Sequence, residues 1–472
     1  MKGVVSISQK YTKAGLMYLF GNIFNKGVAF LTVPIFTRIL SADEYGIVNT
    51  YTATVGILSI LIGMSLHMSI RTAFIDYLEE IEDFMRSIIM LVITSLVIFL
   101  SVSFASIIVF NLNINLTIMV LCILHGSSSA IITNYSTYLM MKFSYKKRTL
   151  ILVLPNLISV LLSVFAILVL FNTNRYMGKI IPTALTTTIF ALVIIIRYVW
   201  NKEKKISTKY WRYAMGISLP IILHALSLNI LNQSDRIMIT TLKNSAETGI
   251  YSLIYNFSMI ANIFIISIEG IWVPWFTKNI SEKNIRQINE KAVYYIDVIS
   301  LAILGIILVS PEVLRLLAPQ EYWIGISIIP PIVLSSYIIF IYTMYVNVEH
   351  YHKKTKHIAL NTIIAATTNV ILNYIFIPQY GMYAAAATTL LSYLISLVLH
   401  YNFSKKIERD LFPFKIFIKP LGLIVFSIII FYLFVENVAV RLGFCIILVI
   451  RSVIKNKKEL LKLINIKAKK EA

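Results

Sequence analysis

Residues 87–109 read SIIMLVITSLVIFLSVSFASIIV, a stretch without a single charged side chain. A transmembrane helix needs about 20 consecutive, mostly apolar residues to cross the hydrocarbon core of a bilayer. Similar segments recur along the whole chain, which has a mean hydropathy of +0.79, 58% apolar residues and 14% charged residues. Hydropathy predicts membrane-spanning helices more reliably than other elements. The sequence therefore predicts an all-α integral membrane protein, and a large soluble helical protein is a much weaker alternative.

We expect 14 membrane-spanning segments, which leave no room for a soluble domain. The expected ranges are 14–38, 45–70, 87–109, 117–141, 150–171, 180–199, 213–240, 249–275, 291–310, 323–348, 358–377, 382–402, 420–435 and 438–453. The first segment lacks the short apolar core and cleavage site of a signal peptide, so we expect it to be retained as a helix. Both cysteines, Cys122 and Cys445, fall inside segments, and we expect neither a disulfide framework nor a metal site.

The basic residues are distributed unevenly between alternate loops. If the N-terminus is cytoplasmic, most of the 43 Lys and Arg residues face the cytoplasm. The residues expected on the outer side are Arg38, Arg175, Lys179, Lys243, Arg315 and Arg441. This asymmetry predicts a multi-pass protein of the cytoplasmic membrane with both termini cytoplasmic. It also explains the net charge of +21 without a nucleic-acid partner and favours contact with membrane lipids.

An internal repeat is indicated by two matches that share one offset. Glu44-Tyr45-Gly46-Ile47 recurs as Glu247-Thr248-Gly249-Ile250, 203 positions later, and Gly178 corresponds to Gly381. Halves of six spans each would insert in the same orientation, related by an axis along the membrane normal. We therefore expect six-helix bundles at 1–206 and 207–410, followed at 411–472 by helices 13 and 14 with a basic cytoplasmic tail.

Polar residues inside the predicted spans are the candidate functional residues. A charged side chain at mid-helix costs about 2.5 to 3.5 kcal/mol on insertion scales, and such residues usually face a cavity. Two stripes have spacings of three and four residues, which place their members on one helix face. They are Asn22, Asn25 and Lys26 in the first span, and Asn229, Asn232, Gln233 and Arg236 in the seventh. Position 26 and position 229 again differ by 203, so the stripes correspond in the two predicted halves.

Further candidates lie elsewhere in the spans. His67 and His125 are candidate cavity-lining residues, and Asp235 and Glu269 could bind a coupling ion. Each has a structural alternative, because intramembrane polar side chains also pack or bond between helices. For Asn369 and Asn373 we favour that structural role.

The chain lacks the motifs of soluble enzymes. It has no Walker sequence, no phosphate-binding glycine loop and no metal-ligand spacing, so we expect no catalytic residue and no cofactor. Short outer loops also argue against an envelope polymerase or glycosyltransferase. The sequence predicts a transporter and not an enzyme.

The chain resembles the Wzx-type polysaccharide flippases of the multidrug/oligosaccharidyl-lipid/polysaccharide (MOP) exporter superfamily. Three stretches carry the resemblance. They are Asn22 to Gly46 with Pro34, Thr37-Arg38 and Tyr45-Gly46; Ser234-Asp235-Arg236-Ile237; and Asn369 to Tyr393 with Leu372-Asn373-Tyr374, Ile377-Pro378, Tyr380-Gly381 and Thr388. The third stretch departs from the family where Tyr383-Ala384 replaces a frequent Gly-Ala pair.

This resemblance implies two six-helix bundles around a central cavity that opens alternately to each side, plus two further helices. It implies a cargo of oligosaccharide on a polyprenyl diphosphate, usually undecaprenyl diphosphate, moved from the inner to the outer leaflet for surface polysaccharide synthesis. Polymerase and glycosyltransferases of the same pathway are the implied partners. Lys26 and Arg236 would attract the diphosphate, and the amides of the two stripes would face the sugar.

Two alternatives within the superfamily remain open. A peptidoglycan-precursor flippase has related chemistry, but we expect a more arginine-rich cavity for it. A cation-coupled multidrug exporter typically has an acidic residue in its first span, where this chain has Asn22, Asn25 and Lys26. The polysaccharide flippase is the favoured interpretation.

Overall fold

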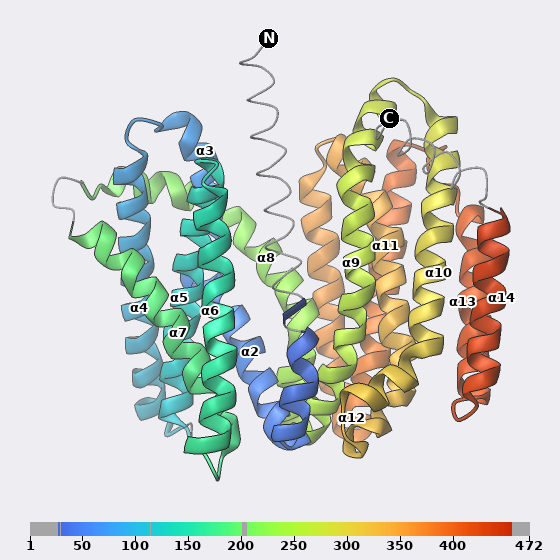
Figure 1. Ribbon diagram of the computed structural model, residues 1–472. Coiled ribbons are helices and arrows are strands. Elements are labelled where there is room, and N and C mark those ends of the chain that lie inside the picture. The colour runs from blue at the N-terminus through green and yellow to red at the C-terminus, as the bar shows by residue number, and fades with distance from the viewer. Residues whose placement is uncertain (1–26, 29, 114, 201–204, 456–472) are drawn as a thin grey trace, which may run out of the picture. The chain divides into compact units, whose positions relative to one another are not determined.

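The computed structural model describes residues 27–28, 30–113, 115–200 and 205–455 (Figure 1). Within these residues the secondary structure is helical, without strands. The main helices are α2 (Ala42–Gly63), α3 (His67–Asp76), α4 (Ile81–Phe110), α5 (Leu116–Met141), α6 (Tyr145–Phe165), α7 (Arg175–Val199), α8 (Thr208–Leu242), α9 (Ser245–Ser281), α10 (Ile285–Leu317), α11 (Ile329–Tyr351), α12 (Thr355–Ile407), α13 (Lys415–Leu433) and α14 (Val438–Lys455). The predicted all-α class is confirmed.

Eleven helical stretches of the described residues are long and apolar enough to cross a membrane. The first predicted span, 14–38, lies mostly outside the described residues, and the part described is a short apolar helix, Phe30–Ile39. The predicted span 45–70 is divided into α2 and α3 at Met64 and Ser65, which have positive φ angles of 48° and 50°. The exact number of 14 spans stays a prediction.

The predicted break between spans 358–377 and 382–402 occurs within α12. Gly381 has φ +55° and ψ −134°, a non-helical conformation between two helical stretches. The left-handed region favours glycine because it has no Cβ atom. An added Cβ would also overlap the carboxylate of Glu247, so both backbone conformation and space require glycine here.

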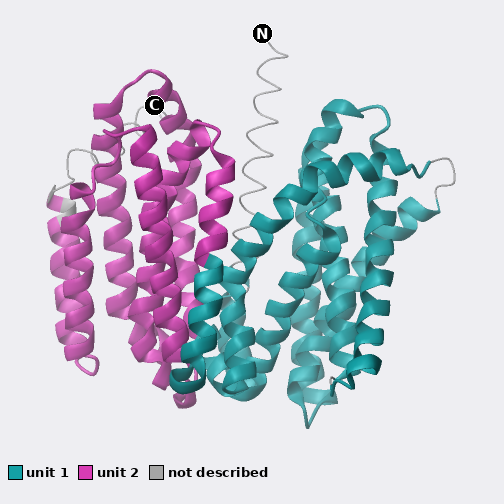
Figure 2. Ribbon diagram, turned by 180° about the vertical axis from the view of Figure 1, so that it is seen from behind, with its two compact units in different colours: residues 1–252, 366–381 teal, residues 253–365, 382–472 magenta. Residues whose placement is uncertain are grey.

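The described chain divides into two compact units, which Figure 2 shows in different colours. Unit 1 comprises residues 1–252 and 366–381, and unit 2 comprises residues 253–365 and 382–472. The unit boundaries therefore fall inside α9 and α12. The repeat-based division at 1–206, 207–410 and 411–472 follows a different criterion and stays a prediction.

Unit 1 contains a reciprocal contact between the first turns of α2 and α9. A Cβ added to Gly46 would overlap the carbonyl oxygen of Ser245, and one added to Gly249 would overlap that of Ala42. Ser245 and Gly249 follow Ala42 and Gly46 by 203 positions each. Small residues at such spacing let two helix backbones approach closely. The two sides of this contact are therefore formed by equivalent residues, related by the offset of 203 positions found in the sequence.

The same offset relates the N-caps of these two helices. Ser41 accepts a hydrogen bond from the backbone N–H of Glu44 (3.2 Å), and Asn244 accepts one from that of Glu247 (2.8 Å). Side-chain caps of this kind satisfy backbone donors that the helix leaves unpaired. Each helix therefore begins in the same way, with the glycine of its contact in the first turns.

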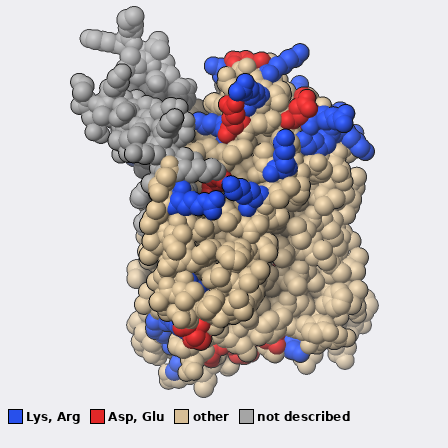
Figure 3. All heavy atoms as spheres, turned by 90° about the vertical axis from the view of Figure 1, so that its right-hand side faces the viewer, with Lys and Arg blue, Asp and Glu red and all other residues tan. Residues whose placement is uncertain are grey.

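In unit 2, α10 packs against α11, α13 and α14. Its buried face includes Ile303 and Ile307, and the hydroxyl of Ser300 donates a hydrogen bond to that of Tyr337 (3.1 Å). On the face drawn in Figure 3, a broad zone with very few charged residues separates an end where Lys and Arg gather from an end with fewer charges. Large apolar side chains are also exposed, including Ile108 at 79% and Ile271 at 68%. Such surfaces suit hydrocarbon on the outside.

Candidate functional site

The polar stripe on α8 is the best described part of the predicted site. Helix α8 begins after Ser207, whose hydroxyl accepts a hydrogen bond from the backbone N–H of Lys209 (3.3 Å). Near the other end, the Arg236 guanidinium donates to the Gln233 side-chain oxygen (2.5 Å) and to the Asn232 carbonyl (3.0 Å). Spacings of three and four residues place these groups on one face. The structure therefore brings the side chains of Gln233 and Arg236 together, whereas the side-chain amide of Asn232 donates to the Leu228 carbonyl (2.7 Å).

Arg236 is buried, with 8% of its surface exposed. Two of its contacts come from its own helix, so the guanidinium lies along α8 instead of extending from it. A guanidinium has five N–H donors in a fixed planar arrangement, which suits bidentate binding of phosphate oxygens. The residue can hold a positive charge at a defined position on this helix.

Asn229 lies further along the same helix, toward its N-terminus. Its side-chain oxygen is buried and has no hydrogen-bond partner among the described residues. It lies 3.4 Å from the position that a Cβ on Gly56 of α2 would occupy. A buried acceptor without a donor costs free energy, so it favours any ligand that supplies a hydroxyl or N–H group. A sugar hydroxyl is such a donor.

Asp235, adjacent in sequence, faces a different set of partners. The Tyr251 hydroxyl donates to one carboxylate oxygen (2.5 Å), and the Asn373 amide donates to the other (2.6 Å). Asn369 accepts from Asn373 (3.2 Å) and from the hydroxyl of Ser234 (3.3 Å). Asp235, Tyr251, Asn369 and Asn373 are all fully buried. The cluster fastens residues 366–381 of α12 to α8 and α9, which accounts for their place in unit 1.

The other predicted residues lie apart from this stripe or beyond the described region. Asn22, Asn25 and Lys26 are outside the described residues. His67 is half-buried at the start of α3. His125 on α5 contacts the Tyr51 hydroxyl through Nδ1 (3.1 Å), with ring centroids 5.7 Å apart. Glu269 belongs to unit 2, where it lines a small cavity with Trp272, Tyr295, Asn347 and neighbouring residues of α9 and α11.

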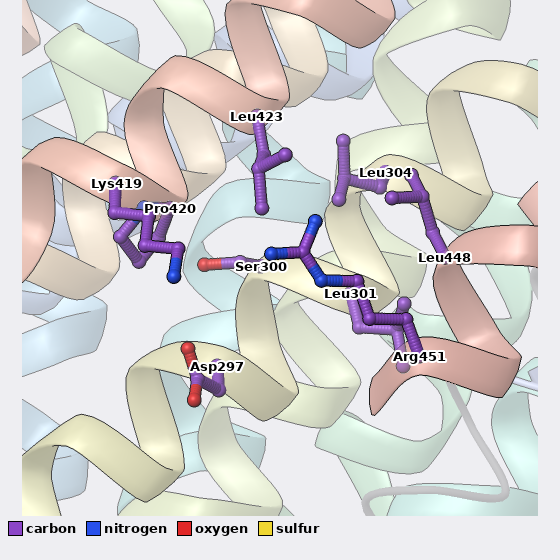
Figure 4. A pocket seen from close by; sticks show the side chains of 9 residues that line it. All are labelled: Asp297, Ser300, Leu301, Leu304, Lys419, Pro420, Leu423, Leu448 and Arg451. Atoms are coloured by element: carbon purple, nitrogen blue, oxygen red, sulfur yellow. The ribbon is translucent and has the colours of Figure 1, made fainter. Parts of the chain in front are cut away.

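Two further cavities are lined mainly by apolar residues. In unit 1, a cavity of about 440 Å³ lies beside Tyr51, with Thr50, Thr54 and Thr240 in its wall. In unit 2, a cavity of about 70 Å³ lies between α10, α13 and α14, where Lys419 and Arg451 share the wall with Asp297 and Ser300 (Figure 4). Neither cavity includes a residue of the α8 stripe.

Two buried pairs of ionisable residues in unit 2 were not predicted from the sequence. One joins Glu349 of α11 to His400 of α12, and the other joins Glu312 of α10 to Arg441 of α14. Glu349 and Arg441 stand at the edges of predicted spans, where a charge is ordinarily assigned to the membrane surface. His400 was the available signal, because it lies inside the predicted span 382–402.

A family model described as "Polysaccharide biosynthesis protein" matches residues 12–280, more than half of the chain. The chain belongs to this family. It is 24% identical over 374 residues to an uncharacterized membrane protein of Haemophilus influenzae, which covers 75% of this chain and 87% of that protein. It is also 22% identical over 401 residues to "Lsg locus putative protein 1" of the same organism, covering 79% and 94%. The match agrees with the resemblance found on the sequence, to a family that takes part in polysaccharide biosynthesis.

Solved structures agree on the fold of this polysaccharide biosynthesis family member. The lipid II flippase MurJ in its inward closed conformation has a TM-score of 0.65 and 17% identity, covering 94% of this chain and 100% of that chain. An inward-facing multidrug resistance MATE family transporter of the MOP superfamily has a TM-score of 0.56 and 13% identity, covering 81% and 94%. The chain thus has a MurJ- and MATE-like fold and is a multi-pass membrane protein.

Proposed function

We propose that this protein is a flippase that moves a polyprenyl-diphosphate-linked oligosaccharide repeat unit across the cytoplasmic membrane. The unit would pass from the inner to the outer leaflet for surface polysaccharide synthesis. The observation that carries the proposal is the α8 stripe of unit 1. There the buried guanidinium of Arg236 lies on the same helix as the side-chain oxygen of Asn229, which has no hydrogen-bond partner among the described residues. Intramembrane polar groups of this kind mark substrate pathways.

The chemistry of the cargo matches these groups. A diphosphate needs cations, a sugar needs hydrogen-bond donors and acceptors, and a prenyl tail can remain in lipid. We assign Arg236 and Lys26 to the diphosphate, and Asn22, Asn25, Asn229, Asn232 and Gln233 to the sugar. His67 and His125 are further candidates for lining the substrate path, and Asp235 or Glu269 for binding a coupling ion.

The finer architecture belongs to the same proposal. It comprises 14 spans, two six-helix bundles that rock for alternating access, a C-terminal helix pair, and both termini in the cytoplasm. The reciprocal contact of Gly46 and Gly249 supports an internal repeat. A polymerase and glycosyltransferases of the same pathway are the proposed partners, and we propose transport without catalysis and without a cofactor.

Gene deletion combined with two assays tests the function. We expect loss of surface polysaccharide and accumulation of undecaprenyl-diphosphate oligosaccharide on the inner leaflet. Intact polysaccharide together with greater sensitivity to cationic dyes would instead establish drug export.

Substitutions on α8 test the site. Arg236→Ala should reduce export, whereas Arg236→Lys should restore part of it because the charge is kept. Arg212→Ala is the matched control, since Arg212 is an exposed arginine near the start of the same helix. Normal export by well-expressed Arg236→Ala and Lys26→Ala variants would refute the assignment.

A peptidoglycan-precursor flippase is the second candidate, favoured by the structural likeness to MurJ. Complementation distinguishes the two. Rescue of a strain depleted of its peptidoglycan-precursor flippase would favour this second function, and failure to rescue alongside restored polysaccharide would favour the first.

A further inference from the structure

Unit 2 contains a buried pair of ionisable residues that the proposed transport path does not use. Glu349 lies in the last turn of α11, and His400 lies in the second helical part of α12. Glu349 has no exposed surface and His400 has 1%. The imidazole Nδ1 and one carboxylate oxygen, Oε1, are 2.9 Å apart. Ionisable residues inside membrane helices are expensive and are usually functional.

Among the described residues, hydrogen-bond partners are found for one oxygen of the Glu349 carboxylate and not for the other. Its second oxygen, Oε2, is buried and has no hydrogen-bond partner among the described residues. A buried carboxylate that stays ionised normally needs hydrogen bonds to its remaining lone pairs. Glu312 in the same unit meets this need, because both of its oxygens accept from Arg441. The Oε2 atom of Glu349 is therefore an open acceptor where a proton can bind.

The imidazole has two neighbours at one nitrogen. Besides Glu349, the side-chain nitrogen of Asn361 lies 3.4 Å from Nδ1. A ring nitrogen that carries hydrogen donates to the carboxylate, and one that does not can accept from the amide. Two arrangements of protons are thus available without moving the helices.

The residues around His400 suit a side chain whose charge changes when it binds or releases a proton. The ring of Tyr342 stacks on that of His400, with centroids 5.5 Å apart and planes 17° from parallel. An aromatic face stabilises an adjacent cation. Among the described residues, the exposed His350, next to Glu349 on α11, interacts electrostatically with both Glu349 and His400, and Glu269 of α9 interacts with Tyr342. His350 adjoins the loop expected to face the cytoplasm.

We propose that Glu349 and His400 form a site that binds and releases one proton, and that this proton drives export. In the empty site the Nδ1–H of His400 donates to the Glu349 carboxylate, and the pair has a net charge of −1. The proton that binds goes to Oε2 of Glu349 or to Nε2 of His400, which makes the pair neutral. No other bond forms or breaks. The role in export rests on the proposed flippase function, whereas proton binding does not.

Infrared difference spectroscopy on the full-length protein in phospholipid nanodiscs tests proton binding. On acidification we expect the carbonyl band of a buried protonated carboxylic acid, lost in Glu349→Gln and shifted in its pH dependence in His400→Gln. Glu312→Gln is the matched control, because its arginine partner keeps the native carboxylate ionised. A band that survives unchanged in Glu349→Gln overturns the site. Glutamine preserves shape, and the His400→Gln arm decides the matter should Glu349→Gln fail to fold.

Measurement of polysaccharide export in cells tests whether the bound proton drives export. Glu349→Gln should abolish the dependence of polysaccharide export on external pH while the protein remains at the wild-type level. Wild-type export by this variant would overturn proton coupling even if the infrared band had been assigned to Glu349. Failure of the flippase proposal gives a different result, because deletion of the gene would then leave the polysaccharide intact.

Discussion

Two buried charges, Asp235 in unit 1 and Arg441 in unit 2, are accommodated in opposite ways. Tyr251 and Asn373, which are neutral, donate hydrogen bonds to the Asp235 carboxylate. Arg441 is fully buried, bonds to both oxygens of Glu312, and donates to the carbonyl oxygens of Leu308 (2.5 Å) and Phe434 (3.0 Å). The arginine keeps its charge at any physiological pH.

This difference in hydrogen-bond partners indicates that the charge of Arg441 is structural and that the charge of Asp235 is suited to ion binding. Arg441 joins α14 to α10 through a bidentate pair and two carbonyl contacts, which leave little for a ligand to add. Tyr251 and Asn373 are groups that an amide at position 235 could also bond, so these two hydrogen bonds do not require the negative charge of Asp235. A charge retained without a structural need is a candidate for function. Four substitutions test this comparison.

Arg441→Ala should have the largest effect. It leaves Glu312 without its partner and two carbonyl groups without donors. Glu312 is 28% exposed, so we expect a loss of about 3 kcal/mol, near the lower end for breaking a buried pair. Thermal unfolding of the purified protein in detergent measures the loss. A melting temperature equal to that of the wild type would show that the pair is not structural.

Tyr251→Phe should have the next largest effect. The change removes one hydrogen bond from a buried carboxylate and adds no bulk, so we expect a loss of about 2 kcal/mol. The same unfolding measurement applies, with Tyr374→Phe, an exposed tyrosine of α12, as the control. Equal melting temperatures for the two variants would contradict the importance of the Tyr251 bond.

Asp235→Asn should change stability by at most about 1 kcal/mol, because the amide can keep hydrogen bonds to both neighbours after rotation of its group. Export, in contrast, should be lost if the carboxylate binds the coupling ion. Polysaccharide export and unfolding are measured on the same variant, with the exposed Asp43→Asn on α2 as control. A large loss of stability with normal export would reverse our assignment of the two charges.

Arg315→Ala should have the smallest effect. Arg315 pairs with Glu436 at 2.6 Å, but 77% of the Glu436 side chain is exposed. Surface pairs contribute about 0 to 1 kcal/mol. The unfolding curve should therefore nearly match that of the wild type, and a loss as large as that of Arg441→Ala would show that burial is not what separates the two arginines.

Periodic features of this fold were predictable from the sequence. Apolar length predicted the helices, and glycine at position 381 marked the break within α12. A spacing of three residues indicated that the side chains of Gln233 and Arg236 are neighbours on α8. These are properties of single helices, and local sequence determines them.

Pairings between distant residues were not predictable in the same way. Asn373 and Asp235 are 138 positions apart, and Glu349 and His400 are 51 apart. The sequence favoured a structural role for Asn373 and Asn369 without identifying their partner. It placed Arg441 on the outer side of the membrane but did not indicate that the side chain is fully buried against α10. Hydropathy reports the expected depth of a residue but not the neighbour that neutralises its charge.

The glycine contact between α2 and α9 has the form of an isologous interface. Residue 46 meets residues 245 and 249, and residue 249 meets residues 42 and 46, so each patch binds its own counterpart. Such an interface closes on itself and leaves no free copy of either patch. If the two segments descend from one ancestral half, that half could have dimerised through this surface before the halves were fused. In the present chain both patches are occupied by each other, so neither can bind a third repeat or another molecule.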